Sequence, residues 1–202
     1  MAETIKGWLV CPAIAEMKTK DLARVSAFTA LAVASDFALT DLLNVKLVDP
    51  IVFSVAFVFG LEMGVCVGVV SEVIWGTLSP YGFGGYIIPF LVAGEVVYAL
   101  AGWATSRIWR GETSRLSARN LYFGAVLALC AFLWDLETNV GTALIASWPS
   151  LTLEIVAVYE YLGIPFMMAH EVSDLATGAI LAPLIIFYAS RSGRARSLSG
   201  DP

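Results

Sequence analysis

The sequence predicts an all-α polytopic membrane protein, a bundle of six transmembrane helices with both termini in the cytoplasm. Composition predicts the membrane class, because 58% of the 202 residues are hydrophobic and only 14% are charged. Length predicts the number of helices, since the chain has room for about six spans of about 20 residues with short connections. The orientation follows from the positions of the basic residues.

Apolar runs mark the predicted spans in chain order. An N-terminal cytoplasmic or interfacial segment (residues 1–20) precedes the membrane domain (residues 21–190), and residues 191–202 form a cytoplasmic tail. The spans are expected over residues 22–43, over 51–78 as two short helices, and over 86–108, 121–146 and 164–190. We place the turn between the two short helices at Glu62–Gly64. Residues 147–163 are expected to form a partly structured cap at the membrane surface.

The distribution of Lys and Arg decides that residues 51–78 form two helices. Basic residues beside span ends stay on the cytoplasmic side, so the basic N-terminal segment and the Arg-rich loop after the fourth span both lie inside. The number of crossings between them must then be even, which requires two helices in 51–78. Only Lys46, of the twelve basic residues, is left outside. The residues placed inside are Lys6, Lys18, Lys20, Arg24, Arg107, Arg110, Arg115, Arg119, Arg191, Arg194 and Arg196.

Polar residues interrupt the predicted fifth span between Trp134 and Thr142. A carboxylate at the centre of a membrane helix costs about 2.5–3.5 kcal/mol, so it normally faces protein or water. At about 100° per residue, one helical face carries Asp135, Thr138, Asn139 and Thr142. We interpret this stripe as part of a binding site. The alternative is that these residues only join helices through hydrogen bonds.

The predicted topology brings polar and aromatic residues from four spans into the outer half of the membrane, below a glycine-rich segment at residues 79–85. Such a convergent set, open to the outside, is typical of a pocket for a small solute. The candidate substrate-binding residues are Glu72, Trp75, Tyr86, Glu95, Trp134, Asp135, Asn139, His170 and Asp174. Several are carboxylates and none is Lys or Arg, which favours a cationic ligand that stacks on aromatic rings. The aromatic residues have an alternative explanation, because Trp and Tyr favour membrane interfaces in any case.

The sequence does not favour an enzyme, a metal site or a bound cofactor. His170 and Asp174 lie four residues apart and share a helical face, as metal ligands do, but the chain has no second His to complete a His-Glu-x-x-His motif. A phosphate-binding loop of the Gly-Lys-Ser/Thr type is also absent, so any ATP hydrolysis must occur on another chain. We expect no nucleic-acid partner.

Four motifs follow one another along the chain. The first span has small residues at Ala23, Ala27, Ala30 and Ala34, and a glycine-rich turn at residues 60–64 joins the two short helices. The fifth span holds Trp134-Asp135-Leu136-x-Thr138-Asn139, and the sixth opens with Pro165-Phe166-x-x-x-His170-x-x-Ser173-Asp174. Over about residues 20–190, the chain resembles the substrate-binding S component of the energy-coupling factor (ECF) vitamin transporters. Family members often have Asn where this chain has Asp174.

The resemblance implies a multi-pass protein of the plasma membrane that binds a vitamin or related micronutrient from outside. Such S components act with a membrane T component and two cytoplasmic ATPase subunits. It also implies that the four alanines of the first span contact the T component, and small residues do allow close helix approach in lipid. The alternative is that these alanines pack inside the bundle. Thiamine, a cationic heterocycle, fits the predicted site, and so does an aminomethylated deazapurine.

A stand-alone, ion-coupled secondary transporter of a small solute is the alternative function. Buried carboxylates can relay protons or sodium ions across a membrane. Such a transporter would need no ATPase, so collapse of the ion gradient should abolish its uptake. The inverted repeats common among these transporters are not evident in the sequence.

The predicted topology can be tested by labelling single added cysteines in intact cells. Ser114→Cys lies in the Arg-rich loop and should react only with membrane-permeant reagents, because that loop is placed inside. Ser150→Cys lies in the predicted cap and should also react with impermeant reagents added outside. The unsubstituted chain, which has three cysteines of its own, is the background control. Labelling of Ser114→Cys by an impermeant reagent would contradict the six-span topology.

Overall fold

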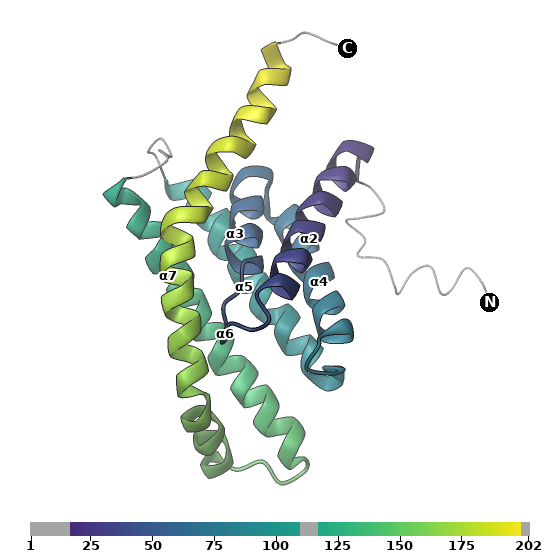
Figure 1. Ribbon diagram of the computed structural model, residues 1–202, viewed down its shortest axis with the longest axis vertical. Helices are drawn as coiled ribbons and strands as arrows, with labels where there is room; N and C mark the ends of the chain where they lie inside the picture. The colour runs from purple at the N-terminus through teal and green to yellow at the C-terminus, as the bar shows by residue number, and fades with distance from the viewer. Residues whose placement is uncertain (1–16, 110–116, 199–202) are drawn as a thin grey trace, which may run out of the picture.

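The computed structural model describes residues 17–109 and 117–198, and the regular structure in this part of the chain is entirely helical (Figure 1). The all-α class that the sequence predicts is therefore confirmed for the described residues. Predictions for residues 1–16, 110–116 and 199–202 lie outside them. The helices are α2 (Thr19–Ala38), α3 (Val48–Phe59), α4 (Leu61–Leu78), α5 (Ile88–Ile108), α6 (Leu121–Ser147) and α7 (Leu153–Leu198), with 3-10 turns η1 (Gly85–Ile87) and η2 (Ala118–Asn120).

Four helices in the described part of the chain are long and apolar enough to cross a membrane: α4, α5 together with η1, α6 and α7. α3 is apolar but has 12 residues, which is about 18 Å of helix against about 30 Å of hydrocarbon. α2 has 20 residues, and charged side chains such as Asp21 and Arg24 make it less apolar. Membrane-helix character is thus shown for four of the six predicted spans. Six crossings with both termini inside stay a prediction.

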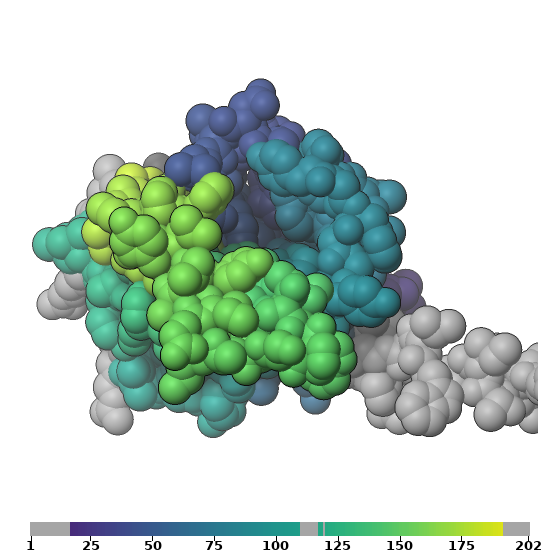
Figure 2. Space-filling model, turned by 90° about the horizontal axis from the view of Figure 1, so that it is seen from below, coloured from purple at the N-terminus to yellow at the C-terminus, as the bar shows by residue number. Residues whose placement is uncertain are grey.

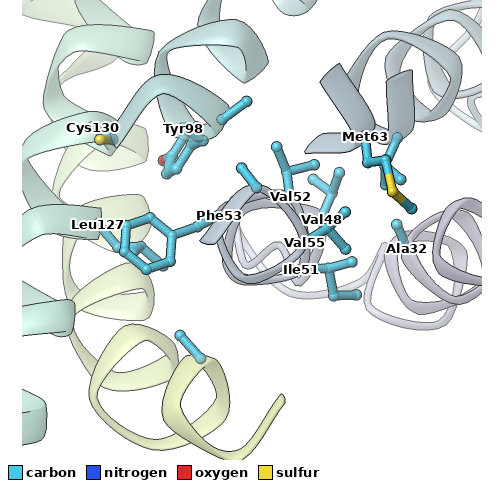
Figure 3. Packing of buried hydrophobic residues seen from close by; sticks show 14 of the residues in the cluster. Ala32, Val48, Ile51, Val52, Phe53, Val55, Met63, Tyr98, Leu127 and Cys130 are labelled. Atoms are coloured by element: carbon cyan, nitrogen blue, oxygen red, sulfur yellow. The ribbon is translucent and has the colours of Figure 1, made fainter. Parts of the chain in front are cut away.

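α3 is the central helix of the bundle. Its residues from Val48 to Ala56 are all buried, and it packs against α2, α4, α5 and α7. In Figure 3, Phe53 points from α3 toward Leu127 of α6, while Ile51 lies on the side nearer Ala32 of α2. Because its flanks face protein, a helix too short to span the hydrocarbon can still lie at membrane depth. Its first turn therefore carries the Asp49 side chain into the interior.

The break between α3 and α4 lies at Gly60, so the prediction of two short helices in residues 51–78 is confirmed. Gly60 has φ 102° and ψ 163°, a conformation that residues with a Cβ atom rarely adopt. The predicted turn at Glu62–Gly64 is wrong by a few residues, because these residues already belong to the first turn of α4. Close packing explains the Gly at position 64, where an added Cβ atom would meet the Ala56 backbone.

α7 is longer than the predicted sixth span. It begins at Leu153, so most of the predicted cap at residues 147–163 is helical, and only a short connection separates α6 from α7. Pro165 lies inside the helix without ending it, which neighbouring helices allow in membrane proteins. α6 packs along α7 more extensively than any other pair of described helices, and this contact supports the added turns.

The described ends of the chain lie at the same end of the bundle. In Figure 1, α2 starts and α7 finishes in the upper part of the view, whereas the α6–α7 connection lies at the bottom. The loop at residues 39–47 and the connection between α4 and α5 face that lower end too. The side of the membrane that each end faces stays a prediction.

Candidate functional site

A cavity of about 480 Å³ opens at the lower end of the bundle. Figure 2 shows this end as a hollow between the loop at residues 39–47, the α4–α5 connection and the helices α6 and α7. The volume is within the range of about 300–1,000 Å³ that is usual for small-molecule sites. The lining residues are Asp36, Leu39, Thr40, Leu42, Leu43, Asn44, Val45, Lys46, Glu72, Trp75, Tyr81, Trp134 and Phe166.

Aromatic rings form one wall of the cavity. The Trp75 ring packs edge-on against Phe37, with 5.3 Å between ring centroids, and against Tyr81 at 6.2 Å. The Tyr81 hydroxyl donates a hydrogen bond to the backbone carbonyl of Thr40. These contacts join the loop after α2 to the connection after α4, so the two segments that flank the opening are held together.

Trp134 also lines the cavity, with its indole beside Lys46. The Lys46 ammonium nitrogen lies 3.2 Å from the centroid of the Trp134 ring, a cation–π contact. Gly94 of α5 lies directly against this indole, and an added Cβ atom there would overlap the ring. None of the candidate residues chosen from the sequence is Lys or Arg, but the loop after α2 folds back and places Lys46 in the cavity.

A buried network of polar groups, centred on His170 of α7, lies at the inner end of the cavity. Its Nδ1 atom lies 3.0 Å from Oδ2 of Asp135 in α6, and its Nε2 atom lies 3.0 Å from Oδ2 of Asp49 in α3. Asn44 donates a hydrogen bond of 3.3 Å to the other oxygen of Asp135. The Trp134 ring meets the His170 ring edge-on at 5.4 Å, so the network and the cavity share a wall.

Tyr98 and Asp174 extend the network toward α5. The Tyr98 hydroxyl donates a hydrogen bond of 2.6 Å to Asp174 and lies 3.5 Å from His170 Nε2. Glu95, one helical turn away from Tyr98, lies beside Asp49 and is fully buried. Gly68 of α4 makes room for it, since a Cβ atom there would come within 2.8 Å of the Glu95 Cβ atom.

Carboxyl groups outnumber basic groups in the cavity and the network. The carboxyl groups are those of Asp36, Asp49, Glu72, Glu95, Asp135 and Asp174, and the basic groups are Lys46 and His170. Taking carboxylates out of water is costly unless each is paired and hydrogen-bonded. One Glu72 oxygen has no hydrogen-bond partner among the described residues, and the Glu95 carboxyl group meets only another carboxyl group, that of Asp49. The arrangement therefore favours protons or a cationic group as a further partner.

The structure brings seven of the nine predicted site residues together. Glu72, Trp75 and Trp134 line the cavity. Asp135 and His170 are hydrogen-bonded to each other in the network. Glu95 adjoins the network at Asp49, and Asp174 adjoins it at Tyr98. Whether any of them binds a solute stays a prediction.

Two predicted site residues lie elsewhere. Tyr86 is 83% exposed, because η1 turns its side chain outward. Asn139 donates a hydrogen bond of 3.0 Å to Glu160 and joins α6 to the first turns of α7, which the sequence analysis did not expect to be helical. Thr138 and Thr142 donate to carbonyl groups of their own helix, so the predicted polar stripe offers no free hydroxyl to a solute.

Sequence reasoning missed several residues of the site. Asp49 falls between the first two predicted spans and is not among the candidates, although an Asp beside a Pro at the start of an apolar run is a helix-start signal. Nothing in the sequence distinguishes Tyr98 as a site residue from the other apolar residues of the predicted span 86–108. Asn44 and Tyr81 reach the cavity only because two loops fold over it, and Asp36 reaches it from the end of α2.

The chain was compared with models of protein families, with curated proteins and with solved structures, and none of them matches. The fold and the site define a helical protein of membrane type with a solute-sized cavity above a buried acidic network. The resemblance to ECF S components stays a prediction from sequence motifs.

The network predicts that His170 stabilises the bundle. His170→Leu removes the partner that Asp49 and Asp135 share, and breaking a buried pair in this way costs about 3–5 kcal/mol. We expect a clearly lower melting temperature in detergent. Asn139→Leu, the control, should lose less, because Glu160 is only partly buried and can be hydrated. Equal melting temperatures for His170→Leu and the unsubstituted chain would contradict the stabilising role.

Proposed function

We propose that the chain is the membrane-embedded substrate-binding subunit of an importer of the ECF type, in which it captures a small water-soluble micronutrient. The cavity of about 480 Å³ is the observation that carries the proposal. It opens at one end of a helical bundle of membrane type and is closed beneath by buried polar groups. A site of this shape holds a solute taken from one side of the membrane.

The lining of the cavity supports a cationic heterocycle such as thiamine as the solute. Trp75 and Trp134 offer ring faces for stacking, and Asp36 and Glu72 offer negative charge. The contact of Lys46 with Trp134 indicates that the indole face accepts a positive charge. A cationic ring could therefore occupy that face in place of the Lys46 ammonium group. An aminomethylated deazapurine has the same combination of ring and charge.

The exposed face of α2 supports a partner in the membrane. Ala23, Ala27, Ala30 and Ala34 are all exposed, so the alternative that they pack inside the bundle is wrong. Exposed small residues at this spacing allow a second helix to approach closely in lipid. We propose that the T component of the importer docks there and that its two ATPase subunits supply the energy.

The hydrogen-bonded chain around His170 favours a second candidate, an ion-coupled secondary transporter. Asp135, His170 and Asp49 follow one another at hydrogen-bond distance across three helices, and such chains of ionisable groups carry protons in transporters. The two candidates differ in their energy source. Uptake that persists after collapse of the ion gradient and stops on ATP depletion supports the importer.

Solute binding should depend on the residues that line the cavity. Glu72→Gln removes a negative charge with little change of shape, and losing a charged hydrogen bond costs about 1.5–3 kcal/mol, or about 10- to 150-fold in affinity. We expect this loss for thiamine, measured by titration of the detergent-purified protein. Tyr86→Ala is the control, since this residue lies outside the cavity. Equal affinities in the two variants would place the solute elsewhere.

Coupling should depend on the alanine face of α2. Ala30→Leu and Ala34→Leu add bulk where close approach is needed, so we expect near-normal thiamine binding but loss of ATP-dependent uptake in cells. Ala176→Leu makes the same change at an exposed position of α7 and should leave uptake intact. Normal uptake with both α2 variants would remove these positions from the docking surface.

A further inference from the structure

Three buried side chains in the network are placed like the ligands of a metal ion. Asp49 of α3 and His170 and Asp174 of α7 each offer one ligand atom, and these atoms lie within 4.8 Å of one another. All three residues are 0% exposed. Metal–ligand distances of about 2.0–2.2 Å separate the ligand atoms of one ion by roughly 3–4.5 Å. A small contraction of the cluster would therefore suffice.

The orientation of His170 is the one found in metal sites. Its Nδ1 atom lies 3.0 Å from the Asp135 carboxylate, which leaves Nε2 facing Asp49 and Tyr98. A histidine that binds a metal almost always donates its other ring N–H to a carboxylate or carbonyl, and this contact fixes the ring. Asn44 in turn donates to Asp135 and holds it in place.

Unpaired oxygens around the cluster supply an independent observation. Glu95 of α5 is fully buried beside Asp49, and its carboxyl group meets that second carboxyl group instead of an N–H donor from the described residues. One further oxygen of Asp49 and one of Asp174 also lack a partner there. Buried acceptors in a low-dielectric interior need a partner, and a cation at this point would satisfy them together.

We propose that Asp49, His170 and Asp174 bind a divalent transition-metal ion, with Glu95 as a fourth ligand and Asp135 as the residue that orients His170. The imidazole ligand disfavours Mg²⁺ and Ca²⁺, which take oxygen ligands. One nitrogen with two or three carboxylates suits Zn²⁺ or Mn²⁺. The ion ties α3, α5 and α7 together beneath the cavity. This site goes beyond the proposed function and does not depend on it.

The test is metal binding to the full chain purified in detergent. After treatment with a chelator, titration with Zn²⁺ should load one ion per chain and raise the melting temperature, whereas Ca²⁺ should not. Asp174→Asn should lose the ion. Asp135→Asn, which changes only the orienting carboxylate, should weaken Zn²⁺ binding by about 10- to 100-fold. Glu137→Gln is the matched control, because Glu137 lies on α6 in a separate groove lined by Pro89, Phe90 and Leu133.

The proposal is overturned if the unsubstituted chain binds neither Zn²⁺ nor Mn²⁺, which would leave protons to neutralise the carboxylates. Undiminished binding by Asp174→Asn would place the ion elsewhere and overturn it as well. Should that variant fail to fold, Co²⁺ bound to the unsubstituted chain decides the matter. Visible absorption bands that Zn²⁺ abolishes support the site, and their absence overturns it. Thiamine is not used, so the outcome is separate from that of the proposed function.

Discussion

The buried carboxylate of Asp49 is the constraint on which the site depends. α3 is enclosed by other helices, so the first turn that starts it necessarily carries this side chain into the interior. A buried carboxylate needs a partner, and His170 of α7 supplies it while also contacting Asp135 of α6. The shared histidine thereby fixes three helices relative to one another. It also packs against Trp134 at the inner end of the cavity.

The shape of the cavity depends on His170 at its inner end and on glycines that leave room for large side chains. Trp134 leans on the His170 ring on one side and on the backbone of Gly94 on another, so its position follows from both. Gly68 likewise leaves room for Glu95 between α4 and α5. Here, close helix packing is combined with bulky buried side chains. Glycine at the points of contact makes this possible, because a Cβ atom there would overlap the neighbouring side chain.

Much of the helical arrangement could be predicted from the sequence. Hydropathy locates each apolar helix, and the placement of Lys and Arg indicates whether the number of membrane crossings between two basic segments is even or odd. The prediction that residues 51–78 form two helices rested on the requirement for an even number of crossings alone. Within the site, Glu72, Trp134 and His170 could be found because polar residues stand out in apolar runs. Asp49 could not be paired with His170, since 121 residues separate them and only helix packing brings them together. The outward turn of Tyr86 and the early start of α7 likewise depend on local backbone and tertiary contacts.

The acidic residues fall into two groups, those that line the cavity and those buried deeper in the bundle. Asp36 and Glu72 line the cavity together with Lys46. Asp49, Glu95 and Asp174 are fully buried and do not line the cavity, so whatever neutralises them must stay with the protein. A molecule bound in the cavity would compensate only the carboxyl groups that line it. The deeper carboxyl groups need protons, hydrogen-bond donors or a bound cation within the protein interior.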